Sequence, residues 1–385
     1  MIYLNNTATS FPKPEAVHKA VNEYVMTPPV HSARSSFERE MEDIDYCCRS
    51  KLAQLFNAPD PYHIVFSSGS TESLNLAIKG SGLEGGHVVS TAIEHNSVIR
   101  PLKMMELEGK IELSFAICDK YGNVKPEDIE NEIKPNTRAI VLNHSSNVTG
   151  SITDIEKVAK IAHKHNCLII VDASQSAGNI PIDVSAWDID LLAFTGHKSL
   201  FGYSGIGGLY VKEGINLKPF KVGGTGVLSE VLVQPDGFPL HYEAGTPNSV
   251  GIVSLKAGVE YILGIGIDKI HAKKSQQVLY MIEELKDHPD LTIYTSTENN
   301  NLSNFCFNIN GIVPEEVGYI FESSYDIIVR TGIHCAPLLL EPVGVHPWGT
   351  VRCSPSYFTT DEEIEKFIDS VKDITKVFLR RRKPQ

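Results

Sequence analysis

The stretch DLLAFTGHKS, residues 190–199, sets a lysine just beyond an apolar run. The run from Leu191 to Phe194 has the length and composition of a buried strand. Lys198 follows it among small and hydroxyl-bearing residues, where an amine loses hydration and keeps the reactivity that a Schiff base requires. Most lysines are solvated surface charges, so the interpretation depends on the neighbouring segments.

A second apolar run, CLIIVDASQS at residues 167–176, places Asp172 where a strand is expected to stop. In an open α/β sheet this position lies at the carboxyl edge, where ligands bind. A carboxylate there can pair with a protonated pyridine nitrogen and strengthen a cofactor ring as an electron sink. Gln175, a short turn further on, can hydrogen-bond the phenolic oxygen of such a ring. Without their neighbours, Asp172 and Gln175 would be more typical of a helix cap and a surface amide.

Two more blocks place polar residues directly after short β-rich runs. In VFSSGSTESLNLAIKG, residues 65–80, a helical pattern begins near Ser70 and Thr71, whose hydroxyls and free backbone N–H groups would cradle a phosphate. In STAIEHNSV, residues 90–98, a short strand ends at His95, whose imidazole can stack on an aromatic cofactor or transfer protons. The first block alone is weak evidence, and the specific signal is the occurrence of all the blocks in this order.

Short apolar runs alternate with helical stretches from about Tyr62 to Tyr210. The alternation predicts an α/β fold with a mostly parallel sheet and helices on both of its faces. Asp172, Lys198 and His95 would then lie at the carboxyl ends of strands, where cofactor sites occur in such folds. This placement supports the motif interpretation independently.

Capping-box spacing predicts where two of the helices begin. Thr153 with Glu156 marks one start, and Thr360 with Glu363 marks another.

Two long helical patterns, at about residues 252–263 and 269–285, mark the passage to a second domain. We predict a large cofactor-binding domain at residues 15–255 and a smaller C-terminal domain at residues 256–385, with residues 1–14 packing on the smaller one. A large and a small domain are the usual arrangement for a chain of 385 residues with 42% hydrophobic composition.

Composition narrows the classes of partner. The chain has 35 basic and 47 acidic residues and a net charge of -12, which disfavours nucleic acid as a ligand. No apolar signal region and no membrane-length apolar run are visible, so we expect no membrane partner and a cytoplasmic location. Seven cysteines, an odd count without CxxC or metal-ligand spacing, favour free thiols in a reducing compartment and no metal site.

Together the blocks resemble the class V aminotransferase family of pyridoxal phosphate enzymes, and within it the cysteine desulfurases and selenocysteine lyases. The resemblance covers nearly the whole chain. It implies fold type I of these enzymes, with a mostly parallel seven-stranded type of sheet in the large domain, a smaller α+β C-terminal domain, pyridoxal 5'-phosphate as cofactor, and a homodimer. The motifs are LNNTATSFPKP, VFSSGSTESLN, IEHNS, NHSSNVTG, VDASQS, TGHKS, EAGTPN, RTGIHCAPLL and GTVRCSPSYF.

The resemblance also implies roles for individual residues. Lys198 would hold the cofactor through a Schiff base, and Asp172 would face the ring nitrogen. Gln175 would bond the phenolate oxygen, and His95 would lie against the ring. The expected phosphate contacts are Ser70, Thr71, Thr195, His197 and Thr246 of the partner subunit. The expected contacts to the α-carboxylate of the substrate are Asn147 and Arg352.

The segment RTGIHCAPLL, residues 330–339, indicates the sulfur chemistry. Cys335 follows His334 and lies near Arg330 in the sequence, a setting that favours ionisation of a thiol. We therefore expect a cysteine desulfurase that converts L-cysteine to L-alanine, keeps the sulfur as a persulfide on Cys335 and passes it to a thiol acceptor, with a sulfur-acceptor protein as one partner. Lys198 would remove the α-proton, and His95 is a candidate donor of the returning proton.

This segment departs from its relatives at one position. Desulfurases that share the short loop usually carry two histidines before the cysteine, whereas Ile333 occupies the first of these positions. Loop chemistry or partner docking is expected to differ accordingly. The apolar segment between Cys335 and Arg352 either shapes a substrate pocket or packs the loop, and packing is the slightly stronger interpretation.

Three alternatives stay open from the sequence. A selenocysteine lyase would act on L-selenocysteine at the same site, with less dependence on Cys335. Another class V lyase or aminotransferase would keep the cofactor, and an aminotransferase would release a keto acid. A cofactor-free sulfur-carrying scaffold is disfavoured because Lys198, Asp172, Gln175 and His95 occur together.

Overall fold

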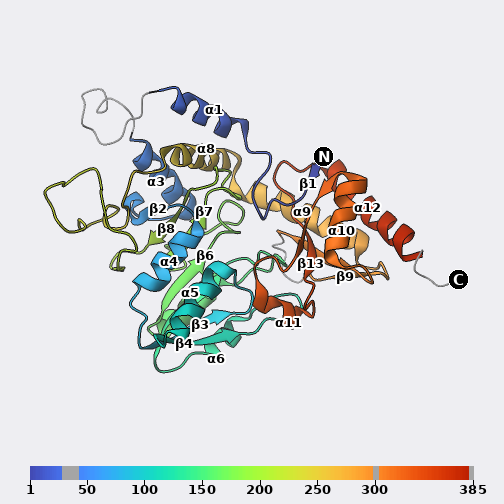
Figure 1. Ribbon diagram of the computed structural model, residues 1–385, viewed down its shortest axis with the longest axis horizontal. Helices are drawn as coiled ribbons and strands as arrows, with labels where there is room; N and C mark the ends of the chain where they lie inside the picture. The colour runs from blue at the N-terminus through green and yellow to red at the C-terminus, as the bar shows by residue number, and fades with distance from the viewer. Residues whose placement is uncertain (28–42, 298–302, 381–385) are drawn as a thin grey trace.

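The structure, a computed structural model, describes residues 1–27, 43–297 and 303–380, and its strands form a large sheet, a smaller sheet and a two-stranded pair (Figure 1). The large sheet has seven strands within this described part, in the order β2-β8-β7-β6-β5-β3-β4. All its strands are parallel except β8, which is antiparallel to both of its neighbours. The α/β fold with a mostly parallel seven-stranded sheet is therefore confirmed. The strands are β2 (Ile64–Ser67), β3 (Gly86–Thr91), β4 (Ile111–Ala116), β5 (Thr137–Asn143), β6 (Leu168–Asp172), β7 (Leu191–Thr195) and β8 (Gly207–Val211).

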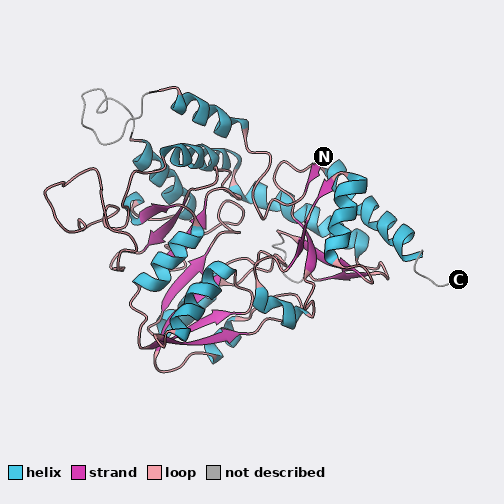
Figure 2. Ribbon diagram, in the orientation of Figure 1, coloured by secondary structure: helices cyan, strands magenta, loops and turns pink. Residues whose placement is uncertain are grey.

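Both faces of this sheet are covered, and β6 shows why its sequence is apolar throughout. Ile169 and Val171 point into one buried apolar cluster, whereas Ile170 points into the other. A strand buried on both faces needs apolar side chains on both, because successive side chains alternate in direction. Figure 2 shows the helices packed around these strands. The helices are α1 (Glu15–Val25), α3 (Ile44–Phe56), α4 (Ser70–Gly80), α5 (Asn96–Leu107), α6 (Pro126–Asn131), α7 (Ile155–Lys164) and α8 (Ser249–Ile265).

The smaller sheet has the order β12-β13-β10-β9 and packs on an aromatic cluster of Phe305, Phe307, Phe321 and Phe367. At the N-terminus, β1 (Ile2–Tyr3) pairs in parallel with β11 (Ile327–Ile328) near this sheet. The predicted limit at residue 255 falls inside the continuous helix α8, and the division into domains stays a prediction. The remaining elements are α9 (Ile267–Leu285), β9 (Leu291–Ile293), β10 (Phe305–Ile309), α10 (Pro314–Tyr325), β12 (Arg330–Gly332), α11 (Leu340–Val343), β13 (Thr350–Cys353) and α12 (Asp361–Arg380), with 3-10 turns at Pro61–His63 and Pro337–Leu339.

One of the two predicted capping boxes forms. Thr360 and Glu363 exchange reciprocal bonds from side chain to backbone N–H, of 2.9 and 3.2 Å, and α12 begins there. The prediction at Thr153 was wrong, because α7 is capped by Asp154, which accepts from the backbone N–H of Lys157 at 3.1 Å. A carboxylate one residue further on satisfies the same free N–H groups and adds a favourable charge at the positive end of the helix.

Within the described residues no single helix is long and apolar enough to cross a membrane. The consecutive helices α8 and α9 are long and apolar enough only when they are taken together, and they are bent by 81° where they join.

The loop after Lys198 is held against α8 by a close approach at Gly258. A Cβ atom at Gly258 would lie 2.1 Å from the carbonyl oxygen of Leu200, whereas Gly264 in the same helix has no neighbouring atom within 4 Å of that position. We expect Gly258→Ala to lower the free energy of unfolding by about 1–3 kcal/mol, because the added methyl group overpacks this contact.

Gly264→Ala is the matched control for helix propensity. It should raise the free energy of unfolding, by up to about 1 kcal/mol, since alanine favours the helix without meeting any neighbour. Urea unfolding of both variants measures the difference. Equal effects of the two substitutions would contradict the role of the close approach.

Candidate active site

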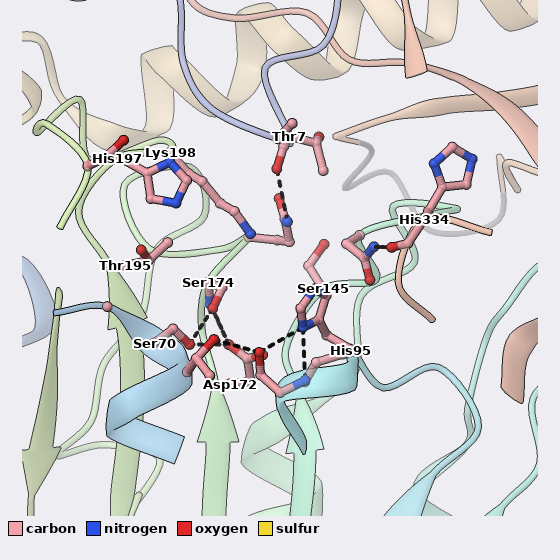
Figure 3. Close-up of a pocket in the computed structure, with 18 of the residues that line it drawn as sticks. Thr7, Ser70, His95, Ser145, Asp172, Ser174, Thr195, His197, Lys198 and His334 are labelled. Carbon is pink, nitrogen blue, oxygen red and sulfur yellow. Dashed lines mark hydrogen bonds between the residues drawn. The ribbon is translucent and has the colours of Figure 1, made fainter. Parts of the chain in front are cut away.

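A cavity of about 450 Å³ lies at the carboxyl ends of the central strands of the large sheet. It is lined from four parts of the chain: the N-terminal segment, the start of α4, the segments that follow β3, β5, β6 and β7, and the region of β12 and β13. Figure 3 shows these side chains converging on a common space. Of the residues predicted from the sequence, those that line the cavity are Ser70, Thr71, His95, Asn147, Asp172, Gln175, Thr195, His197, Lys198 and Arg352.

Asp172 lies at the end of β6, buried among hydroxyl groups. Its Oδ1 accepts the backbone N–H of Ser174 at 2.9 Å and the hydroxyl of Ser70 at 3.3 Å, and it also accepts the hydroxyl of Ser174 (Figure 3). These donors fix the carboxylate at the wall of the cavity. Such a fixed negative charge can pair with a cationic ring nitrogen.

Lys198 extends its amine into the same cavity from the turn after β7 (Figure 3). No carboxylate among the described residues forms an ion pair with it. Burial lowers the pKa of Lys198 to about 8, and the positive charges of Arg352 and Arg330 act in the same direction while Asp172 opposes them. A larger fraction of this lysine is therefore an uncharged amine at neutral pH than for a surface lysine, as a nucleophile or base requires.

His95 caps the start of α5 through its ring. The backbone N–H of Ser97 donates to Nδ1 at 3.0 Å, so Nδ1 is the acceptor and the neutral ring carries its proton on Nε2. Burial lowers the pKa of His95, Lys198 and Arg330 lower it further, and Asp172 opposes them. The hydroxyl of Ser97 also forms a hydrogen bond of 2.8 Å with the hydroxyl of Thr71. The arrangement gives a neutral N–H donor at the cavity wall.

The start of α4 opens into the cavity without a side-chain cap. Gly69 precedes the helix with a φ of +151°, a conformation that glycine adopts readily, and no side chain bonds the first N–H groups. Ser70, Thr71 and Thr195 bring hydroxyls to the same end of the cavity, which suits a phosphate. His197 is neutral there, since burial lowers its pKa to about 4 together with the charges of Lys198 and Lys13.

Arg352 is a fully buried cation with vacant bonding capacity. Its guanidinium donates to the carbonyl of Asn147 and to Oδ1 of Asn5 at 3.0 Å, while Nε has no partner among the described residues. Burial lowers the pKa of Arg352 to about 9, and Arg330 contributes to that shift. Asn147 donates to the carbonyl of His334, and its own Oδ1 has no partner in the part of the chain that the structure describes. A carboxylate entering this end of the cavity would supply the missing acceptor for the arginine.

Cys335 lies beside this cavity and lines an adjoining open groove of about 490 Å³. Nη2 of Arg330 is 3.3 Å from its Sγ, the contact that the sequence suggested. The backbone N–H of Asn96 donates to the carbonyl of Cys335 at 2.8 Å. His334 and Cys335 have φ angles of +57° and +64°, an uncommon conformation for residues with a side chain. The loop is thus held with a half-buried thiol next to a cation.

Two other predicted features lie at the surface. Thr246 is exposed and lines neither the cavity nor the groove, so its role toward a partner subunit stays a prediction. Ile333, which replaces a histidine of related loops, is 46% exposed at the edge of the cysteine loop. No group of three potential metal ligands occurs among the described residues.

Sequence reasoning missed several polar residues that complete the cavity. Ser174 bonds Asp172, Ser97 orients His95, and Thr7 accepts from the amide of Gln175 at 3.2 Å (Figure 3). Ser174 and Ser97 each lie two positions from a predicted residue, so the local motif contained the signal. Thr7 had no such signal, because only the fold brings the N-terminal segment to β6.

Glu94 was also missed, and it is the fully buried carboxyl behind His95. Its Oε1 accepts the hydroxyl of Thr91 at 2.6 Å and the backbone N–H of Asn143 at 3.0 Å, and so it joins the ends of β3 and β5. Its Oε2 has no partner among the described residues. Burial raises the pKa of Glu94 to about 8, and the charge of Asp172 acts in the same direction. Glu94 is therefore mainly protonated at neutral pH.

The comparisons with known proteins agree with this geometry. The family described as Aminotransferase class-V matches residues 2–367. The chain is 31% identical over 397 aligned positions to a cysteine desulfurase of Wigglesworthia glossinidia brevipalpis, covering 99% of this chain and 94% of that protein, and 32% identical over 383 positions to one of Cronobacter sakazakii, covering 96% and 92%. A solved apo cysteine desulfurase of Thermococcus onnurineus NA1 superposes with a TM-score of 0.91 at 32% identity, covering 97% of this chain and 94% of that chain.

The buried Glu94 makes stability depend on pH. Folding raises its pKa, so the folded chain retains a proton between pH 4.5 and about 8 that the unfolded chain has lost. The contribution of Glu94 to stability therefore falls as pH rises through this window, by about 1.4 kcal/mol for each unit of pKa shift, and levels off above it. Glu94→Gln removes this titration, so the free energy of unfolding of the cofactor-free variant should rise relative to that of the wild type as the pH increases from 5 to 8.

Urea unfolding at a series of pH values measures this dependence, with the exposed Glu322→Gln as control. The control should follow the wild-type pH dependence. A Glu94→Gln curve parallel to the wild type would show that Glu94 does not hold its proton in the folded state.

Proposed function

Because the chain belongs to the class V aminotransferase family, we propose that it is a pyridoxal phosphate-dependent cysteine desulfurase, which releases L-alanine from L-cysteine and keeps the sulfur as a persulfide on Cys335. The observation that carries this proposal is the contact of Arg330 with the sulfur of Cys335, beside a cavity that joins Lys198 to Asp172. The relatives named above are cysteine desulfurases, and the chain aligns with nearly their full length.

The residues that line the cavity fit the cofactor. Within the described residues, a helix start without a side-chain cap, a lysine without an ion pair and a fixed carboxylate match the phosphate, the aldehyde and the ring nitrogen of the cofactor in turn. When bound, pyridoxal phosphate supplies an electron sink for negative charge at the α-carbon of an amino acid. The residues that would hold it are Ser70, Thr71, His95, Asp172, Gln175, Thr195, His197 and Lys198.

The buried Arg352 would orient the substrate. The unpaired capacity of Arg352, with Asn147 beside it, would bind the α-carboxylate of L-cysteine and exclude water from it. The amine of Lys198, its pKa lowered by burial, then removes the α-proton.

Sulfur leaves the substrate through Cys335. Its thiolate, beside the guanidinium of Arg330, attacks the substrate sulfur and forms a sulfur–sulfur bond. The carbon–sulfur bond of the substrate breaks, and its electron pair remains with the carbon fragment. Nε2–H of His95 would donate the proton that completes L-alanine, since Nδ1 accepts from Ser97.

We also propose a homodimer, in which Thr246 completes the phosphate site of the partner subunit. Large apolar side chains are exposed along the segment from Phe220 to Val233, with Leu232 98% exposed. Such a cluster is typical of a surface covered by another protein chain. A sulfur-acceptor protein and a cytoplasmic location belong to the same proposal, and the seven cysteines, which form no disulfide within the described residues, are consistent with a reducing compartment.

Replacement of Cys335 tests the proposed reaction. Cys335→Ala should retain the absorbance of the bound cofactor but form neither persulfide nor L-alanine from L-cysteine, because the sulfur nucleophile is missing. The control is Cys47→Ala, which removes a half-buried cysteine on α3 and should leave turnover unchanged. Full activity of Cys335→Ala on L-cysteine would overturn the mechanism.

The same assay separates the related activities. Loss on L-cysteine with activity kept on L-selenocysteine would indicate that both substrates are used, whereas a keto acid product would indicate amino-group transfer.

Replacement of Arg352 tests the carboxylate site. Arg352→Lys keeps the charge but loses the planar pair of donors, so KM for L-cysteine should rise about tenfold to a hundredfold with a smaller change in kcat. The exposed Arg138→Lys on β5 serves as control and should leave KM unchanged. An unaltered KM in Arg352→Lys would place the carboxylate elsewhere.

A further inference from the structure

The open groove beside Cys335 runs between α4 and α5, which lie side by side (Figure 1). Asn75 and Lys79 follow Thr71 at intervals of four residues on α4, so one face of that helix forms one wall. On α5, Arg100 and Met104 follow Asn96 at the same interval and form the other wall. The groove shares Thr71, His95 and Ser97 with the cavity, and Cys335 lies where the two spaces meet.

The groove carries an excess of positive charge in a chain whose net charge is -12. Among the described residues that line it, Lys79 and Arg100 are cations and none is a carboxylate. Both side chains are exposed, and neither forms an ion pair within the described part of the chain. Both α4 and α5 begin at the end of the groove nearest Cys335, so the positive ends of their dipoles add to the positive potential there. A small anion is therefore attracted toward Cys335 along this path.

We propose that the groove binds a low-molecular-weight thiol that carries a carboxylate, and that this thiol accepts the sulfur from Cys335. The inference rests on the proposed function, because it requires a persulfide on Cys335. Arg100, one turn from Asn96 on α5, binds the carboxylate while the thiol end reaches the persulfide, and Lys79 in the last turn of α4 adds to the field that attracts the anion. The groove is more open than the cavity, as a passing small molecule requires, whereas the substrate occupies the more enclosed cavity behind it.

The transfer balances without an added oxidant or reductant. The thiolate of the acceptor attacks the outer sulfur of the Cys335 persulfide, and a new sulfur–sulfur bond forms on the acceptor. The bond between Sγ of Cys335 and the outer sulfur breaks, and its electron pair leaves with Sγ as a thiolate. Arg330, 3.3 Å from Sγ, stabilises that leaving thiolate. The acceptor departs as a persulfide, and the enzyme thiol is restored.

The test loads the holoenzyme with L-cysteine, removes free substrate and follows removal of the persulfide by mass spectrometry. Three thiols are compared at low ionic strength: 3-mercaptopropionate, which is anionic, 2-mercaptoethanol, which is neutral, and cysteamine, which is cationic. Replacing both cations, in the variant Arg100→Gln with Lys79→Gln, should slow removal by 3-mercaptopropionate about tenfold. The rate with 2-mercaptoethanol should change less than about twofold, and cysteamine should gain. Comparing variant with wild type for each thiol cancels the differences in intrinsic thiol reactivity.

Two further variants separate charge from other effects. Arg100→Lys keeps the charge and should retain most of the rate with 3-mercaptopropionate. Lys103→Gln removes a cation on α5 that lies outside the groove and pairs with Glu106, so it should behave as the wild type. Added salt should reduce the advantage of the anionic thiol in the wild type.

Equal slowing of all three thiols in the double variant, or no slowing at all, overturns the inference and leaves the desulfurase proposal intact. Absence of any persulfide on the loaded wild-type enzyme overturns both proposals.

Discussion

An excess of positive charge around one cavity is the constraint on which this site depends. Lys198, Arg330 and Arg352 face the cavity, whereas Asp172 is its one unpaired carboxylate among the described residues. Glu72, at the rim, is already bonded to Lys221 at 2.7 Å. Removing cations from water without matching anions is costly, and the lowered pKa values of Lys198 and Arg352 express that cost. Phosphate and carboxylate groups of ligands supply the missing negative charge, so the fold is built to be completed by anions.

The parallel sheet is what makes this concentration of polar groups tolerable. Asn143 and Asp172 are register partners at the ends of adjacent strands, and Ala193 continues that register on β7. Below this line the central strands β6 and β7 are apolar and buried on both faces, so their polar groups lie at the carboxyl end. Glu94, which follows β3, accepts the backbone N–H of Asn143 at the end of β5. Because Glu94 remains mainly protonated at neutral pH, it adds no second negative charge beside Asp172.

The sequence predicted the parts of the site that follow strands, for a physical reason. An apolar run that ends in a polar residue indicates both a strand and its direction, and so Asp172, Lys198 and His95 were placed correctly at one edge. A helix cap that either of two neighbouring residues could form was not predictable in this way. Asp154 caps α7 in place of its neighbour Thr153, and both are residue types that cap helices. Contacts such as that of Thr7 with Gln175 arise only when distant segments meet.

The position of Cys335 separates the sulfur step from the proton steps in space. Its loop is fixed by bonds to Asn96 and, through Nε2 of His334, to the carbonyl of Thr350 at 2.9 Å, and these bonds hold two successive residues at positive φ. Such backbone strain persists only where surrounding contacts impose it. The contacts keep the thiol outside the cavity that holds Lys198 yet within reach of Arg330. A nucleophile at that junction can face the substrate on one side and solvent on the other, which suits a group that must accept sulfur and then release it.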